Sequence, residues 1–304
     1  MIAPAPHYHT DMASLVGGLE AGGTKFVCAV GTGPDDIRAE ARFATTTPEQ
    51  TIRRAVDFFT EVAARTPLAA IGIASFGPLD LDRRSATFGF ITTTPKAGWQ
   101  DVDLVSPLAA LGAVVAIDTD VNAAALAEHR WGAARGAGSA VYVTVGSGIG
   151  GGAVIDGRPV HGLVHPEMGH LRLPHDRARD PFPGTCPHHG DCWEGLASGP
   201  ALAARWGQPA ETLPDDHPAW DLEAHYLALG LANVILTLSP ERVVLGGGVM
   251  ARPGLAALVR QKLGDLVGGY LRTPMLAARI DDYVVPPALG DRAGVLGALA
   301  LAGA

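Results

Sequence analysis

Short apolar runs that end in glycine-rich or polar turns alternate along this chain with longer segments of helical periodicity. Runs of this length, bounded by turn residues, are typical of buried strands. The predicted strands span residues 15–20, 25–30, 68–74, 113–117, 139–145, 150–157 (with its turn), 243–245 and, near the end, 277–285. Strands that alternate with helices predict an α/β fold.

Apolar residues spaced by three and four predict the helices. The first begins at Thr47, which suits the N-cap position, with Pro48 at N1 and Gln50 at N3. Its apolar face is formed by Ile52, Val56, Phe59 and Ala63. Further helices are predicted from residue 123, after a turn at 195–200, as an amphipathic segment at 222–236 after a loop at 217–220, and at 255–266 and 295–301. The last is too apolar to be a free tail.

Two glycine-rich turns each join a pair of predicted strands. The first is Ala-Gly-Gly-Thr at residues 21–24, and the second is the run at 146–152, about 125 residues later. Bare backbone lets N–H groups approach a phosphate closely, although any hairpin can use glycine for its turn alone. Gly146, Gly148 and Gly151 match G-x-G-x-x-G, but a strand follows them where dinucleotide binding requires a helix. The two hairpins therefore suggest two similar halves, each with a possible phosphate clamp.

Polar residues follow other predicted strands. The strand at 113–117 delivers Asp118, Thr119, Asp120 and Asn122 at its carboxyl end, where ligands of open α/β sheets bind. Asp120 is equally suited to be the N-cap of the next helix, and both roles remain open. Residues 92–99 combine threonines with Trp99, which suits the rim of a sugar site as well as an ordinary surface loop. Three glycines at 246–248 permit a flat group to lie against bare backbone.

A cysteine- and histidine-rich segment at residues 167–194 carries the most specific chemistry. Cys186, His189 and Cys192 follow the pattern Cys-x2-His-x2-Cys, and His170 lies upstream. Two thiolates and two imidazoles form a tetrahedral set that Zn²⁺ prefers, with His188 left as a solvated neighbour. The alternative is a disulfide between Cys186 and Cys192, which the absence of any sign of secretion disfavours.

Two carboxylates flank this segment. Glu167 precedes His170 by three residues, and Glu194 follows Cys192 by two. Because the second nitrogen of a metal-bound imidazole can still form a hydrogen bond, His170 and the two acids can surround a polyhydroxy ligand. The alternative is a structural zinc loop with solvated acids.

The composition excludes several classes of protein. The chain has 304 residues, of which 47% are hydrophobic and 18% charged, as in a soluble globular protein long enough for two domains. A net charge of −8 argues against nucleic-acid binding through a broad basic face. Residues 1–12 lack a signal peptide, and no apolar run spans a bilayer, so we expect a cytoplasmic protein without a membrane partner. Cys28, the third cysteine, is expected in the core.

Six motifs follow one another along the chain. They are Glu-Ala-Gly-Gly-Thr-Lys at residues 20–25, Asp-Thr-Asp-Val-Asn at 118–122, the glycine run at 146–152, Glu-x-Gly-His at 167–170, the cysteine loop at 186–192 and Leu-Gly-Gly-Gly-Val at 245–249. In this order, over residues 15–301, the chain resembles the sugar kinases of the ROK family, and specifically the zinc-containing bacterial fructokinases. The cysteine loop combined with Glu-x-Gly-His is the specific part of the resemblance.

The resemblance implies a two-domain actin–hexokinase-type ATPase fold with a cleft between the domains and a zinc-binding loop at about residues 170–194. Residues 14–121 plus 291–304 would form the N-terminal α/β domain, and residues 122–290 the larger one. The implied activity is ATP-dependent phosphorylation of a hexose at its C6 hydroxyl, with D-fructose giving fructose 6-phosphate. Mg²⁺ would accompany ATP, Zn²⁺ would be structural, and the assembly would be a homodimer.

The same resemblance assigns roles to single residues. Asp120 would be the base that takes the proton of the sugar hydroxyl. Sugar binding would fall to Glu167, His170, Glu194, Gly77 and Pro78, and zinc binding to His170, Cys186, His189 and Cys192. ATP would lie against Gly22, Gly23, Thr24, Lys25, Thr144, Gly146, Ser147, Gly148, Pro200, Gly246, Gly247, Gly248, Val249 and Met250. Phosphoryl transfer fits such a set because it needs positioning and a base more than covalent chemistry.

Departures from the family pattern bear on specificity. Many related kinases have Asp where this chain has Glu20. Glucose-type members usually have Asn-Asp in place of Thr119-Asp120 and a loop richer in cysteine, so both differences favour fructose. Kinases for mannose or glucose remain alternatives. Sugar-responsive regulators of the family are another, but only about a dozen residues precede the first predicted strand, which is too short for a helix-turn-helix domain.

Overall fold

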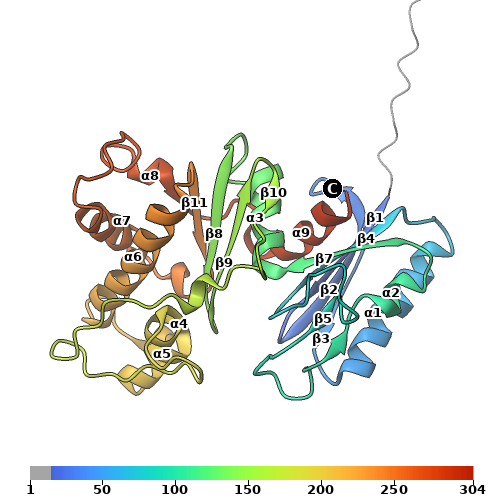
Figure 1. Cartoon of the computed structure of the whole chain (residues 1–304), viewed down its shortest axis with the longest axis horizontal. Helices are drawn as coiled ribbons and strands as arrows, with labels where there is room; N and C mark the ends of the chain where they lie inside the picture. The colour runs from blue at the N-terminus through green and yellow to red at the C-terminus, as the bar shows by residue number, and fades with distance from the viewer. Residues whose placement is uncertain (1–14, 304) are drawn as a thin grey trace, which may run out of the picture.

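The computed structural model describes residues 15–303. The expectations about a signal peptide and a helix-turn-helix domain in the first dozen residues lie outside this range. Two five-stranded sheets stand side by side, with two helices between them, α3 (Asp120–Trp131) and α9 (Ala293–Ala302) (Figure 1). Within the described range, no helix combines the length and the apolar character that a bilayer crossing requires.

The first sheet has the strand order β3-β2-β1-β4-β7. Its strands are β1 (Val16–Ala21), β2 (Lys25–Gly33), β3 (Asp36–Ala44), β4 (Ala70–Ser75) and β7 (Val114–Thr119). β1 pairs antiparallel with β2 and parallel with β4, which pairs parallel with β7. Helices α1 (Pro48–Ala63) and α2 (Ser106–Ala109) cover one face, and β5 (Phe90–Ile91) pairs with β6 (Val102–Asp103) nearby. The core on this face includes Phe26, Phe59, Ile71 and Trp99, all buried.

The second sheet repeats this topology with the order β10-β9-β8-β11-β12. Its strands are β8 (Ser139–Val145), β9 (Ile149–Ile155), β10 (Arg158–Pro159), β11 (Arg242–Gly246) and β12 (Val284–Val285). As in the first sheet, an antiparallel hairpin, β8–β9, precedes the parallel strand β11. The expectation of two similar halves is confirmed, and the α/β fold with it.

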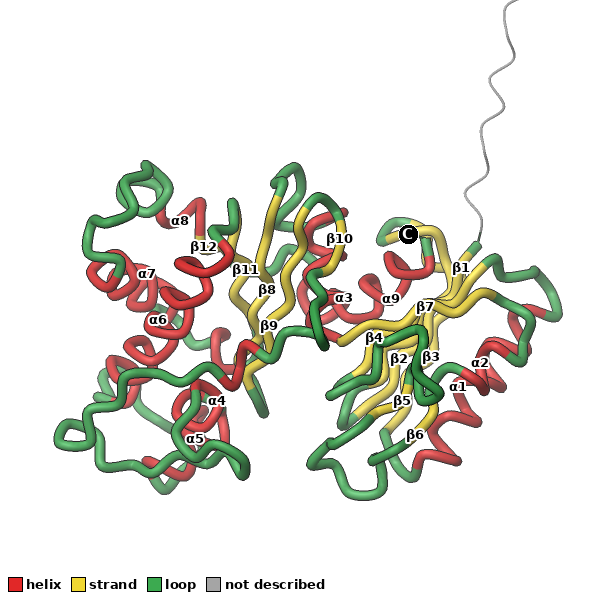
Figure 2. Tube along the Cα trace, in the orientation of Figure 1, coloured by secondary structure: helices red, strands yellow, loops and turns green. Residues whose placement is uncertain are grey.

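Helices pack on the second sheet on the side away from the first (Figure 2). They are α4 (Trp193–Ala197), α5 (Gly199–Trp206), α6 (Ala219–Leu238), α7 (Leu255–Leu266) and α8 (Ile280–Tyr283). Single 3-10 turns occur at η1 (Met168–His170), η2 (Ala210–Thr212), η3 (Val249–Ala251) and η4 (Gly290–Arg292). The large core of this half includes Trp193, Leu196, Leu227 and Leu231.

Glycines let α9 approach its neighbours closely. A Cβ at Gly72 of β4 would lie 1.9 Å from the carbonyl oxygen of Ala298, and one at Gly297 would lie 2.3 Å from the carbonyl of Ala123 in α3. The last helix therefore packs on the first sheet and against α3, so it is not a free tail, as its apolar character predicted. The assignment of residues 14–121 plus 291–304 and 122–290 to separate domains stays a prediction.

Several local predictions are corrected. The strand near 277–285 is wrong: residues 280–283 form α8, whose Asp281 and Asp282 interrupt the apolar run, and only Val284–Val285 pair in the sheet. The turn predicted at 195–200 is wrong except at Ser198, because residues 195–197 end α4 and residues 199–200 begin α5. The loop predicted at 217–220 gives way at residue 219 to α6, which is buried on most of its surface and not strongly amphipathic.

The helix caps were predicted with mixed success. Thr47 caps α1 as expected, because its hydroxyl accepts a bond from the N–H of Gln50. At α3, however, the cap is Thr119, whose hydroxyl accepts from the N–H of Asn122 at 3.2 Å. Asp120 is the first helical residue and bonds only the adjacent N–H of Val121, so the alternative role of Asp120 as N-cap is wrong.

A buried glutamate holds α3 to the segment that leads into α9. Glu128 is fully buried, and its two oxygens accept the N–H groups of Ala133, Ala288 and Leu289 at 2.7, 3.1 and 2.9 Å. Glu128→Ala would leave three backbone donors without this acceptor, at about 1–3 kcal/mol each where they stay dry. We expect a loss of roughly 3 kcal/mol or more in the free energy of unfolding, measured by urea titration. Glu128→Gln, which keeps one acceptor oxygen, should lose clearly less.

Candidate active site between the two sheets

Asp120 lies where two cavities meet. It follows β7 directly and opens α3, so its position is set by the end of a buried strand and by the Thr119 cap. Both a cavity of about 550 Å³ and another of about 450 Å³ are lined by Asp120 and Val121. A group held in one cavity can therefore react with a group held in the other, beside the same carboxylate.

The environment of Asp120 favours its neutral form. Burial raises the pKa of this carboxyl to about 7, and repulsion by Glu20 and Glu167 adds to the rise, while the hydrogen bond from the N–H of Val121 opposes it. A carboxyl whose pKa lies near neutrality can take up a proton during a reaction and release it afterwards. The geometry and the charge thus suit a general base.

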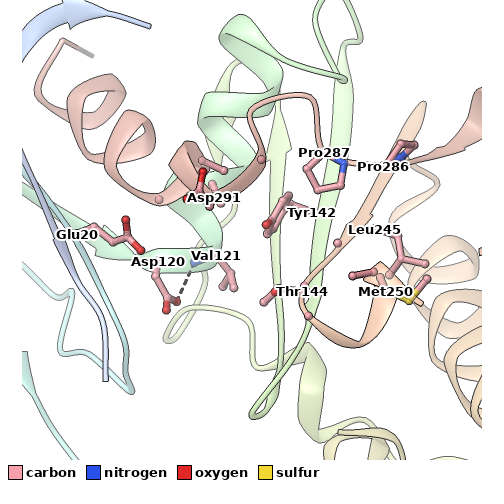
Figure 3. Close-up of a pocket in the computed structure, with 18 residues that line it drawn as sticks. Glu20, Asp120, Val121, Tyr142, Thr144, Leu245, Met250, Pro286, Pro287 and Asp291 are labelled. Carbon is pink, nitrogen blue, oxygen red and sulfur yellow. Dashed lines mark hydrogen bonds between the residues drawn. The ribbon is translucent and has the colours of Figure 1, made fainter. Parts of the chain in front are cut away.

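The cavity of about 550 Å³ is lined by glycine-rich backbone on one side and by acids on the other. Gly246 ends β11 and Gly247 and Gly248 follow it, while Glu20 comes from β1 and Asp291 from η4. Figure 3 shows Glu20, Asp120 and Asp291 on one side and Tyr142, Thr144, Leu245 and Met250 on the other. Gly247 has φ +97°, and a Cβ there would lie 2.3 Å from the carbonyl oxygen of Val145, so this position requires glycine.

Glu20 is suited to a cation. Burial raises the pKa of its carboxyl, and its Oε2 is buried without a hydrogen-bond partner. A buried carboxylate oxygen that lacks a donor is well matched to a divalent ion such as Mg²⁺, which prefers oxygen ligands. Glu20 and Asp120 are therefore the residues that would face Mg²⁺ here.

A third cavity, of about 630 Å³, adjoins the first through Gly248 and Ala251. Its walls come from the glycine turn between β8 and β9, from the start of α5 and from η3. The lining residues include Gly146, Ser147, Pro200, Trp220, Val249 and Arg252. A cavity with walls of bare backbone, proline and tryptophan, continuous with the glycine-lined cavity beside Asp120, suits a nucleoside and its phosphates.

The cavity of about 450 Å³ is the polar one. Gly77, Pro78, Thr93 and Pro95 line it from the first half, and Glu167, His170 and Glu194 line it from the second. Burial raises the pKa of Glu167, while the charge of His170 lowers it and the charge of Glu194 raises it. Oε2 of Glu194 accepts the N–H of Ile149 at 3.0 Å, so this acid also touches the glycine turn. Carboxylates and imidazoles that line the same cavity can form hydrogen bonds to the hydroxyl groups of a sugar.

The proposed metal ligands come together as the sequence predicted. One ligand atom each from His170, Cys186, His189 and Cys192 lies within 4.8 Å of all the others. Nδ1 of His170 is 3.7 Å from Sγ of Cys186 and 3.5 Å from Sγ of Cys192. Ligands of a tetrahedral Zn²⁺ with Zn–S near 2.3 Å and Zn–N near 2.05 Å stand about 3.6 Å apart, so the cluster fits this ion. Both thiols are free, which leaves the disulfide alternative without support.

Some predicted site residues lie elsewhere. Gly22, Gly23, Thr24, Lys25 and Gly148 line none of these three cavities. The turn that holds the first four is closed on itself and on Thr45, whose hydroxyl donates to the carbonyl of Gly22 at 2.7 Å. Cys28 is buried in the core, as expected. His188 is exposed, as expected, but also lines the polar cavity.

The sequence reading missed several lining residues. No local sequence pattern indicated a site role for Asp291, Trp220 or Arg252, because each lines a cavity only through the packing of elements that are distant in the chain. His165 was visible as an additional imidazole two residues before Glu167. Asp118, part of the predicted acidic cluster, is buried and bonded to Asn122 and His161 at 2.9 Å each, so it supports the loop and lines none of the three cavities.

Comparison with known proteins agrees with this geometry. A fructokinase of Zymomonas mobilis subsp. mobilis is 46% identical over 296 residues, which cover 95% of this chain and 96% of that protein. The structure of a ROK hexokinase from Thermus thermophilus superimposes with a TM-score of 0.75 at 30% identity, covering 95% of this chain and 97% of that one. A ROK family glucokinase from Streptomyces griseus, solved with glucose and AMPPNP, gives a TM-score of 0.72 at 26% identity, covering 95% and 99%. A sequence model of the ROK family matches residues 16–304. With this match over nearly the whole length and the six motifs in order, the chain belongs to the ROK family.

Proposed function

We propose that this protein transfers the γ-phosphoryl group of ATP to the C6 hydroxyl of D-fructose, giving fructose 6-phosphate and ADP. The observation that carries the proposal is the shared position of Asp120, between a glycine-lined cavity and a polar one. The identity to a fructokinase, 46%, exceeds the 26% identity to a glucokinase, which supports fructose as the substrate.

In this proposal each cavity has its own ligand. The sugar lies among Glu167, His170, Glu194 and the Gly77–Pro78 turn, with its C6 hydroxyl toward Asp120. The carboxylate of Asp120 accepts the hydroxyl proton as the oxygen attacks the γ-phosphorus, and the bond to the bridging oxygen of ADP breaks. Mg²⁺, when bound with ATP, would neutralise phosphate charge beside Glu20 and Asp120.

ATP is proposed to occupy the two glycine-lined cavities. Its adenosine lies beside Pro200, Val249 and Met250, and its phosphates lie along Thr144, Gly146, Ser147 and the turn at 246–248. Gly22, Gly23, Thr24, Lys25 and Gly148 would reach the phosphates only if the two halves closed further. The role of these five residues in phosphate binding stays a prediction.

The direct test is steady-state kinetics with ATP and a panel of hexoses. Fructose should show the highest kcat/KM, and the product should carry phosphate at C6. A higher kcat/KM for glucose or mannose would replace fructose as the substrate while keeping the reaction. No turnover with any hexose, together with sugar binding, would favour a sugar-responsive regulator.

The pH dependence of kcat/KM should reveal Asp120. Its pKa of about 7 means that the carboxyl is protonated, and useless as a base, at lower pH. We expect kcat/KM to fall about tenfold per pH unit below 7 and to level off above it, because this parameter reports groups of the enzyme before the sugar binds. Glu20→Gln should move this limb to lower pH, since repulsion by Glu20 raises the pKa of Asp120. A flat profile between pH 5 and 8 would contradict the assignment.

Location and assembly are proposals of the same kind. An ATP-dependent kinase whose metal cluster requires two reduced thiols suits the reducing, ATP-containing cytoplasm, which we propose as its location. The homodimer rests on the family resemblance, and light scattering of the purified protein would test it.

A further inference from the structure

His165 connects the two halves of the polar cavity. It lies between β10 and η1 and is 3% exposed. Its Nε2 is 3.0 Å from the backbone nitrogen of Leu79, 86 residues earlier in the chain, and its Nδ1 is 3.4 Å from Oε1 of Glu167. Leu79 follows the Gly77–Pro78 turn, so the ring bridges the wall from the first half and an acid from the second.

The hydrogen bond to Leu79 decides how the ring is protonated. A backbone N–H can only donate, so Nε2 must accept and carries no hydrogen. The ring hydrogen of the neutral imidazole then resides on Nδ1, which hydrogen-bonds to the carbonyl oxygen of Pro166 at 3.5 Å and has Oε1 of Glu167 beside it at 3.4 Å. Burial lowers the pKa of His165, which favours this neutral form.

The ring also lies beside the wall that it holds. A Cβ built on Gly77 would lie 3.6 Å from Cε1 of His165, so a side chain added at this glycine would reach the ring. The Gly77–Leu79 segment is held by the hydrogen bond from Leu79, while Oε1 of Glu167 lies at the opposite edge of the ring. A displacement of either partner would change the width of the cavity in which the sugar is proposed to bind.

We propose that His165 is a positioning residue for the hexose: it fixes the Glu167 carboxylate and the Gly77–Leu79 wall at one separation through opposite nitrogens of its ring. This role rests on the proposed sugar kinase activity. His165 acts through Glu167 and the wall, so its loss should weaken hexose binding and leave ATP binding unaffected. Removal of a residue that orients a metal ligand typically lowers affinity or activity by about 10–100-fold, and we expect an effect of the same order here.

Three substitutions separate the two contacts. His165→Gln keeps an acceptor near the position of Nε2 but loses the donor beside Glu167. His165→Asn keeps a donor near the position of Nδ1 but cannot reach Leu79, and His165→Ala removes both. We expect His165→Ala to raise the KM for fructose about 10–100-fold, with Gln and Asn in between. KM for ATP and kcat should stay within about threefold, since the lost interactions stabilise the bound sugar equally in the ground state and in the transition state.

A second histidine supplies the matched control. His129 is half-buried, and its Nε2 lies 2.8 Å from the carbonyl oxygen of Ala137, but it lines none of the cavities described above. His129→Gln should leave the KM for fructose unchanged. A double-mutant cycle of His165→Ala with Glu167→Gln should be non-additive, because the two side chains act as one unit. An unchanged KM for fructose in folded His165→Ala, or an additive cycle, overturns the proposal.

An experiment without substrate tests the role of His165 independently of the proposed kinase activity. Nitrogen-15 NMR of the ring should show Nδ1 protonated and Nε2 bare in the wild-type protein. A hydrogen on Nε2 overturns the positioning role, whatever the enzyme phosphorylates. If the wild-type protein phosphorylates no hexose, the proposed function fails, and fructose titration of His165→Ala by calorimetry then decides the role in sugar binding. Thermal midpoints of all variants identify any that do not fold.

Discussion

Asp120→Asn is expected to lower the kcat of fructose phosphorylation by about 10²–10⁴-fold, the contribution of a general base, while ATP and fructose still bind. The asparagine amide has nearly the shape of the carboxylate but cannot accept the proton of the C6 hydroxyl. Asp120 is the residue, with Val121, that lines both the glycine-rich and the polar cavity, so its loss affects the transfer itself.

The stability of the same variant supplies the control. The folded-state pKa of Asp120 is about 7, against 3.8 for the free side chain, so stability that is present below pH 3.8 is lost as the pH rises toward 7. Asp120→Asn removes this cost, and its thermal midpoint at pH 7.5 should be equal to or above that of the wild type. Turnover within about threefold of wild type would contradict the role of base.

Removal of Zn²⁺ should abolish tight fructose binding. All four ligands are protein groups, as in structural zinc sites, which contribute on the order of 10 kcal/mol of apparent folding free energy. Without the ion, residues 179–194 should lose order, Glu194 should be displaced, and the ring of His170 should be free to rotate out of the polar cavity. ATP affinity should fall less, because Pro200 and the turn at 246–248 lie on other elements.

Calorimetric titration of ATP and of fructose, before and after chelation, measures this effect. Cys192→Ser should reproduce part of it and lower the zinc content. Cys28→Ala is the matched control, since Cys28 is a buried free thiol in the core of the first half and outside the metal cluster. Unchanged fructose affinity in zinc-free protein would contradict this prediction and would mean that the zinc ion stabilises its own loop without influence on the sugar site.

The sequence-based predictions agree with the structure where the interacting residues lie close together in the chain. Thr47 and Gln50 form the predicted cap because the bond closes within one helical turn. Cys186, His189 and Cys192 meet because only five residues lie between the outer two, which confines these three ligands to one loop. The prediction of a strand at 277–285 was wrong because it considered the apolar residues of this segment and not Asp281 and Asp282, which lie in the helix α8.

The sequence by itself predicted most of the strands of the two sheets, the glycine turns, the metal loop and the carboxylate of Asp120 at the end of a strand, since each depends on residues close together in the chain. Tertiary structure alone decided which of these groups share a cavity. His165 meets Leu79, and Asp291 faces the cavity of Glu20, only because α3 and α9 pack between the two sheets and fix their separation. A contact between residues 86 or more positions apart depends on the packing of every element between them, and no local pattern records it.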